Sequence, residues 1–184
     1  ALLNFQSKLN DLLQRKLFSY SMISIVWMIF FCAIGVSVVY WFDWLENKQY
    51  FIYGFFIAIC LAYVDLFKRQ ATNLQKLSIP TFYEKIIPKI TLPFAFLLIL
   101  YYGFSEAQGL IFYAVSFAVM LIAIGFYLFN YFKPVYTLNY KDLFQEISKK
   151  QYYQYSLYAF SASLGSFFAF RIDSLMIPEF ISNA

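Results

Sequence analysis

The sequence predicts an all-α integral membrane protein with about five transmembrane helices. Of its 184 residues, 62% are hydrophobic and 13% are charged, whereas soluble domains are about 45–50% apolar and about 25% charged. The charges are also unevenly spread: none lies between Lys16 and Asp43, and none lies from Ala107 to Phe132. Uncharged stretches of this length can cross a hydrocarbon core about 30 Å thick. A soluble fold could not hide them, even with an aromatic-rich core.

The apolar stretches define the expected elements. The spans are predicted over residues 18–41, 50–67, 87–104, 109–132 and 154–178. The third is expected to start around Pro88 and Pro93, where proline interrupts backbone hydrogen bonding. Residues 1–16 alternate apolar and polar side chains at helical spacing, which predicts an amphipathic helix lying along the membrane surface. A second short interfacial helix is predicted around residues 142–147.

The aromatic residues support these boundaries. The chain has 24 Phe and 17 Tyr, and many Tyr and Trp fall at the ends of the apolar stretches, such as Tyr40, Trp41 and Trp44. Amphipathic rings are stable where hydrocarbon meets headgroups. We therefore place the membrane boundaries near these rings.

The positive charges between the spans predict the orientation. Basic residues occur before the first span and in the loops after the second and fourth spans, whereas the loops after the first and third spans contain one and none. The basic residues in chain order are Lys8, Arg15 and Lys16, then Lys48, then Lys68, Arg69, Lys76, Lys85 and Lys89, then Lys133, Lys141, Lys149 and Lys150. Because Lys and Arg favour the cytoplasmic side, we expect residues 68–89 and 133–153 to be cytoplasmic and residues 42–49 and 105–108 to face outward.

The composition argues against an enzyme. The sequence has no histidine, so imidazole metal sites and histidine-based triads are excluded. Cys32 and Cys60 both fall inside predicted spans and are interpreted as small apolar fillers. No glycine-rich phosphate loop is present. We expect no catalytic residues, no metal, no cofactor and no nucleic-acid partner. Transport by this chain would be driven by an ion gradient or by the substrate's own gradient, unless a separate ATPase subunit drives it.

Arg171 and Asp173 are the candidate functional charges of the fifth span. Asp173 lies four residues beyond Ala169 and continues a small-residue face with Ala162 and Ser166, so it is a candidate for helix packing or ion coupling. Arg171 lies about 200° around the helix from Asp173 and is a candidate for binding an anionic substrate. In the alternative interpretation both lie near the outer end of the span, where Arg171 reaches the headgroups.

A second charged group lies at the end of the second span. Asp65 is followed at three and four residues by Lys68 and Arg69, a spacing at which side chains form ion pairs within a helix. We interpret the three as interfacial residues. The basic segment 68–89 could also attract anionic headgroups or a pyrophosphate-linked substrate, although the cytoplasmic preference of Lys and Arg explains its charge without a ligand.

Three short segments resemble a known transporter family. Arg171-Ile172-Asp173-Ser174-Leu175-Met176-Ile177 resembles the start of the second lobe in Wzx-type polysaccharide flippases, members of the multidrug/oligosaccharidyl-lipid/polysaccharide exporter superfamily. Leu66-Phe67-Lys68-Arg69-Gln70 and Leu77-Ser78-Ile79-Pro80 resemble the family's loop after the fourth helix. The resemblance implies that this chain is an internal fragment, corresponding to helices three to seven of a two-lobe, fourteen-helix transporter.

The resemblance also implies a domain division and a function. Residues 1–132 would form part of the N-lobe, residues 133–153 the cytoplasmic lobe linker, and residues 154–184 the first helix of the C-lobe. The parent protein would be a multi-pass protein of the bacterial inner membrane that flips lipid-linked oligosaccharide for polysaccharide biosynthesis. Its partners would be the lipid bilayer, the lipid-linked oligosaccharide and the missing helices.

Three alternatives remain open at this point. A MATE-like multidrug exporter would have a cavity dominated by acidic residues. A membrane-embedded glycan polymerase or ligase would need a large outward loop carrying clustered Arg or His, whereas the outward loops predicted here are very short. A structural membrane scaffold is the third alternative, and it would have no central cavity.

Overall fold

The computed structural model describes residues 5–6, 9–41, 48–137, 139–158 and 161. These residues form helices joined by short turns, and no strand occurs among them. The main elements are α2 (Asp11–Trp41), α3 (Lys48–Asn73), α4 (Ser78–Tyr102), α5 (Glu106–Tyr131) and the short α6 (Lys141–Glu146), followed by helical residues 149–158. The predicted all-α class is therefore confirmed for the described residues.

Three of the helices are long and apolar enough to cross a membrane. They comprise Asp11–Val38 within α2, Ser78–Tyr102, and Ala107–Tyr131 within α5. The 26 residues of α5 span about 39 Å, more than the hydrocarbon thickness. These helices support the membrane-protein character that the composition predicts.

The second and fifth predicted spans are not among these three helices. Residues 50–67 do form a helix, as part of α3, but its described length includes Asp65, Lys68 and Arg69, and it is not among the three most apolar helices. The predicted fifth span, 154–178, lies outside the described residues apart from its first turn and residue 161.

Two predicted boundaries are wrong. The amphipathic segment and the first span were expected to be separate helices, but α2 runs without a break from Asp11 to Trp41, because no proline or glycine interrupts the sequence near Leu17. Likewise, α4 begins at Ser78 and continues through Pro88 and Pro93. Each proline removes only one backbone donor, and the surrounding turns maintain the helix.

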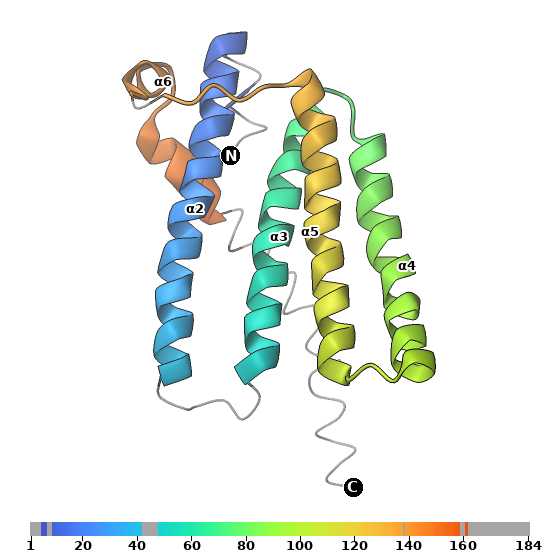
Figure 1. The fold of residues 1–184 in the computed structure, drawn as a ribbon. Helices are drawn as coiled ribbons and strands as arrows, with labels where there is room; N and C mark the ends of the chain where they lie inside the picture. The colour runs from blue at the N-terminus through green and yellow to red at the C-terminus, as the bar shows by residue number, and fades with distance from the viewer. Residues whose placement is uncertain (1–4, 7–8, 42–47, 138, 159–160, 162–184) are drawn as a thin grey trace, which may run out of the picture.

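The helices pack side by side in the order α2, α3, α5, α4, which differs from their order in the chain (Figure 1). Helix α5 is central and contacts both α3 and α4, while α2 contacts α3 and α6. As a result α3 and α5 run parallel, and both end at the side of the bundle where α2 and α4 begin. In the apolar stretch of α5, 39% of residues are buried, against 6% in α2 and in α4.

The core lies between α2, α3 and α5. Phe18, Phe67, Met120, Ile124 and Phe132 are among its buried members, and the Phe18 ring lies 6.0 Å from Phe67 and 5.7 Å from Phe132. Gly125 allows close approach here, because a Cβ atom at this position would come within 3.3 Å of the Phe67 ring. The edge-to-face pair of Phe18 and Phe132 adds to the apolar packing that holds helices together in a bilayer.

The turns are fixed by local chemistry. Helix α4 ends at Gly103, whose φ of 66° is a left-handed conformation that glycine adopts without strain. Helix α5 begins with a capping box: the Ser105 hydroxyl accepts from the Gln108 backbone, and the Gln108 side chain accepts from the Ser105 backbone. Helix α6 confirms the short helix that the sequence predicts around residues 142–147.

Candidate functional site

Most charged residues of the described helices belong to the turns near one end of the bundle, where α2 and α4 begin and α3 and α5 end (Figure 1), whereas Lys48 and Glu106 lie at the opposite helix ends. This end contains every ion pair found among the described residues. We call it the charged end. It combines the basic segments that the sequence predicts to be cytoplasmic.

The sequence-predicted residues Asp65, Lys68 and Arg69 divide between two ion pairs. Arg69 Nε lies 2.8 Å from Asp65 Oδ2, one turn away on α3, and both side chains are well exposed. Lys68 Nζ instead lies 2.7 Å from Glu84 Oε2 on α4, and this pair is partly buried. Lys68 therefore joins two helices. Sequence reasoning did not single out Glu84, because its distance from Lys68 in the chain gives no periodic signal.

Arg171 and Asp173 lie outside the described residues, as do Ala162, Ser166 and Ala169. The structure therefore provides no geometry for the predicted substrate-binding and helix-packing charges. Their roles remain predictions from the sequence.

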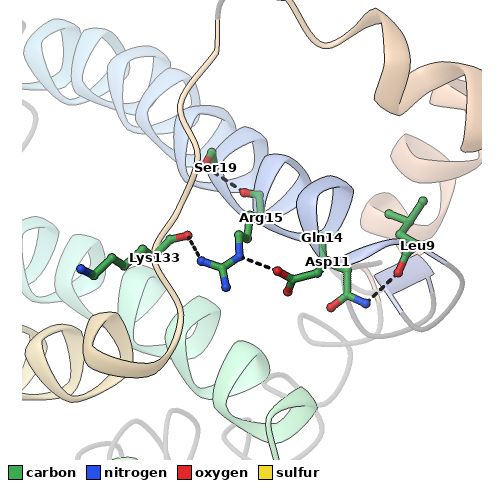
Figure 2. A network of polar contacts seen from close by, with 6 residues as sticks. All are labelled: Leu9, Asp11, Gln14, Arg15, Ser19 and Lys133. Carbon is green, nitrogen blue, oxygen red and sulfur yellow. Dashed lines mark hydrogen bonds and ion pairs between the residues drawn. The ribbon is translucent and has the colours of Figure 1, made fainter.

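Arg15 connects α2 to the end of α5 (Figure 2). Its Nε donates to Asp11 Oδ2 at 3.0 Å, and its Nη1 donates to the Lys133 carbonyl oxygen at 3.3 Å. The guanidinium carbon also lies 5.2 Å from the centre of the Phe132 ring. Arg15 thus uses its planar group for an ion pair, a backbone contact and a cation–π contact.

Lys76 supplies a second cation at the end of α5. Its Nζ lies 3.1 Å from the centre of the Tyr131 ring. Helix α5 has no basic residue in its own last turn, and a helix C-terminus carries partial negative charge. Arg15 from α2 and Lys76 from the α3–α4 turn therefore provide, from other elements, the positive charge that favours this helix end.

A buried amide cluster ties the N-terminal segment to α3. Gln6 Nε2 donates to Gln70 Oε1 at 2.8 Å, and Asn73 Nδ2 donates to Gln6 Oε1. Gln6 is 2% exposed and Gln70 is fully buried. Gln70 Nε2 has no partner among the described residues. Because buried amides are costly unless hydrogen-bonded, this cluster specifies one position for the segment around Gln6.

Aromatic residues dock the segment after α5 onto α2. The Tyr20 ring is surrounded by Tyr140 at 5.2 Å, Phe144 at 5.0 Å and Tyr152 at 5.8 Å. Lys16 Nζ forms an ion pair with Asp142 Oδ2 at 3.1 Å. The hydroxyls of Tyr152 and Ser21 are 2.9 Å apart. Ser21 already donates to the Leu17 carbonyl, so Tyr152 is the donor, and burial raises the pKa of its phenol.

The charged end has a surplus of positive charge. The acidic residues Asp11, Asp65, Glu84 and Asp142 are each engaged in an ion pair, and Glu146 is the remaining described acid of this end. The lysines that form no ion pair with another described residue are Lys76, Lys85, Lys89, Lys133, Lys141, Lys149 and Lys150. Such a surface can attract anionic groups. Across the described ranges, no group of three or more His, Cys, Asp or Glu side chains could hold a metal ion.

Two apolar grooves lie away from the charged end. One, of about 440 Å³, lies between α4 and α5 and is lined by Phe96, Ile99, Gly109 and Tyr113 among others. The other, of about 500 Å³, lies on the exposed side of α2 and includes Ala33 and Ser37. Neither groove contains a charged residue, so both can hold hydrocarbon or apolar side chains.

No protein family, curated protein or solved structure matches this chain.

Proposed function

We propose that this chain forms part of the N-lobe, the lobe linker and the first helix of the C-lobe of a membrane transporter, whose parent protein flips lipid-linked oligosaccharide across the bacterial inner membrane. The resemblance of Arg171–Ile177, Leu66–Gln70 and Leu77–Pro80 to polysaccharide flippases motivates the substrate. Three helices that are long and apolar enough to cross a membrane support a location in a membrane. The proposed process is transport without covalent chemistry.

The face of α2 that no other described residue covers is the observation that carries this proposal. Trp27, Phe30 and Phe31 on this face are 54–66% exposed, although their helix is fixed on its other side by the core. The small residues Ala33 and Ser37 lie one turn apart within the groove on α2. Small residues at this spacing allow another transmembrane helix to approach closely. A lobe that contacts further helices of a transporter requires such a face.

The contacts at the charged end fit a lobe that moves as one body. Arg15 joins α2 to the end of α5, and Lys68 joins α3 to α4. Alternating access depends on largely rigid rocking of one helical bundle against another around a shared site. Under this proposal Arg171 faces the pyrophosphate of the substrate, and its planar fork suits phosphate oxygens. Asp173 then packs against a neighbouring helix or couples an ion.

Substitutions in the parent protein test the proposal. Arg171→Ala is expected to abolish glycan export with normal expression, and Arg171→Lys to restore part of it, because an ammonium group keeps the charge but loses bidentate hydrogen bonding. Asp173→Asn is expected to lower folded yield if the residue acts in packing. Export is measured as surface glycan, and transport as flipping of fluorescent lipid-linked sugar in reconstituted vesicles.

The outcomes also separate the competing functions. Unchanged export by Arg171→Ala would reject substrate binding by this residue. Efflux of cationic drugs without flipping of lipid-linked sugar would instead support a MATE-like exporter. Elongation or transfer of glycan by the purified parent protein would support a polymerase or ligase.

A further inference from the structure

The outer face of α4 carries lysines at one end and apolar side chains along the rest. Helical positions three or four apart lie on the same face, and six such positions form a continuous exposed stripe. The stripe consists of Phe82, Lys85, Lys89, Leu92, Phe96 and Leu100. Its lysines lie in the half of α4 nearer the charged end, and Leu92, Phe96 and Leu100 follow them in a helix that is long and apolar enough to cross a membrane.

The two lysines of the stripe form no ion pair with another described residue. The adjacent acid, Glu84, is engaged by Lys68 at 2.7 Å. Neither Lys85 nor Lys89 forms an ion pair within the described ranges, and both side chains are exposed. Two ammonium groups one helical turn apart can bind one phosphate group together. This favours an anionic group next to the apolar stretch of α4.

The apolar part of the stripe forms one wall of the groove between α4 and α5. Leu92, Phe96 and Leu100 line this groove of about 440 Å³ from α4, and Gly109 lines it from α5. The helices approach closely at Gly109, where an added Cβ atom would lie 2.6 Å from Ile99 Cδ1. The groove therefore ends against a tightly packed floor and offers an almost wholly apolar surface.

We propose that this face of α4 binds an anionic phospholipid of the bilayer, with its phosphate at Lys85 and Lys89 and an acyl chain in the α4–α5 groove. From the lysine pair to Phe96 the helix rises about 14 Å, which matches half of a hydrocarbon core about 30 Å thick. A packed protein helix would satisfy the apolar groove but would leave both lysines in need of acidic partners. A phospholipid satisfies both parts. The inference does not depend on the proposed transport function.

Tryptophan quenching tests the proposal at the groove. Phe96→Trp is introduced into a chain whose Trp27, Trp41 and Trp44 are changed to Phe, and the protein is reconstituted with lipids brominated in their acyl chains. Brominated phosphatidylglycerol is compared with brominated phosphatidylcholine. A lysine near an anionic lipid surface changes binding about fivefold, so the preference for phosphatidylglycerol is expected to be up to about 25-fold.

Charge variants connect the groove with the lysines. The double variant Lys85→Gln with Lys89→Gln is expected to quench almost equally with the two lipids. Each single variant is expected to lower the preference for phosphatidylglycerol about fivefold. Lys141→Gln with Lys150→Gln is the matched control, because these lysines are also exposed but belong to α6 and to the helical segment after it, and α6 and α4 lie on opposite sides of α2 (Figure 1). This control is expected to keep the preference. Circular dichroism verifies that each variant is folded.

Three results would overturn the proposal. Equal quenching by the two lipids would show a groove that binds hydrocarbon without selecting a headgroup. An unchanged preference in the Lys85 and Lys89 double variant would place the anionic selection elsewhere. Weak quenching by both lipids would show that protein covers this face of α4.

Discussion

Individual side chains at the charged end have partners from distant parts of the chain. Lys68 lies within pairing distance of Asp65 along α3, yet its ammonium group contacts Glu84 on α4. Arg69 instead forms the ion pair with Asp65 within α3. The difference has a geometric basis: residues three and four apart both reach Asp65, but only Lys68 is directed toward α4. The inter-helix pair is also less exposed than the intrahelical one, so its charges are less screened.

We expect removal of the Lys68–Glu84 pair to destabilise the bundle by about 1 kcal/mol, because the pair is partly buried. Lys68→Gln and Glu84→Gln are measured by thermal unfolding in detergent. The exchanged pair Lys68→Glu with Glu84→Lys should recover much of the loss. Asp65→Asn is the control and should cost less than about 0.5 kcal/mol, because the Asp65–Arg69 pair is exposed. Equal losses at both pairs would contradict this assignment.

The buried amide of Gln70 gives a second expectation at this scale. Gln70→Leu replaces the buried amide with an apolar side chain of similar size and leaves the Gln6 Nε2 group without its acceptor. An unsatisfied buried amide costs about 1–3 kcal/mol, so unfolding should occur at a lower temperature. The control is Gln145→Leu, because Gln145 is exposed. Gln75→Leu is not suitable, because Gln75 has a positive φ. Stability equal to the parent chain would show that the cluster around Gln6 contributes nothing.

At the scale of elements, the end of α3 shows how a tight turn brings two long helices together. The Lys76 backbone N–H donates to the Ala71 carbonyl at 2.8 Å, and the Gln75 N–H donates to the Thr72 carbonyl at 3.0 Å. This pair of bonds is a Schellman motif, which needs a left-handed residue at the position of Gln75. Its φ is 56°. Glycine is the residue that adopts this conformation without strain.

Gln75→Gly is therefore expected to stabilise the α3–α4 turn by up to about 1 kcal/mol, since relief of the left-handed strain exceeds the entropy that glycine loses on folding. Gln75→Val should destabilise it, because a branched side chain fits this conformation poorly. Both are compared by the temperature of unfolding in detergent. A decrease for Gln75→Gly would mean that the side chain makes a favourable contact that outweighs the strain.

The segment after α5 is the second element-scale feature. It is held on α2 by the Tyr20 ring cluster and by the Tyr152–Ser21 hydrogen bond. Tyr152→Phe should weaken the docking by about 1 kcal/mol and Tyr152→Ala by about 3 kcal/mol, through loss of the hydrogen bond and of the buried ring. Weaker docking is measured as faster tryptic cleavage after Lys149 and Lys150, and Tyr152→Ala should be cleaved faster than Tyr152→Phe. Tyr158→Ala is the control and should leave the cleavage rate unchanged, because the Tyr158 ring is 69% exposed. Faster cleavage of this variant would indicate general unfolding.

At the scale of the whole molecule, the charged end and the apolar helices define a direction across the membrane. We expect residues 68–89 and 133–153 to be cytoplasmic, because Lys and Arg concentrate there. Single cysteines at Asn47 and Asn139, in a chain with Cys32→Ser and Cys60→Ala, are treated with an impermeant reagent in intact cells. Asn47→Cys should be labelled and Asn139→Cys should not. The reverse pattern would invert the orientation.

The sequence by itself determined the class of the protein and the positions of most helices. Long uncharged stretches predict helices wherever they occur, because an unpaired backbone cannot lie in hydrocarbon, and α5 and α6 follow the prediction closely. The predicted separation of two helices near Leu17 and the predicted start of the third span near Pro88 were wrong. Periodicity and proline are local signals, and a helix that is packed beyond the membrane boundary continues past them.

Only the tertiary structure decided which helices are neighbours and which charges meet. The packing order α2, α3, α5, α4 depends on shape complementarity, such as Gly125 against Phe67 and Gly109 against Ile99. Nothing in the spacing of residues along the chain encodes these contacts. The Lys68–Glu84 pair and the α4–α5 groove follow from that order. Periodicity identifies the face of each helix, but long-range packing free energy selects the surface that the face contacts.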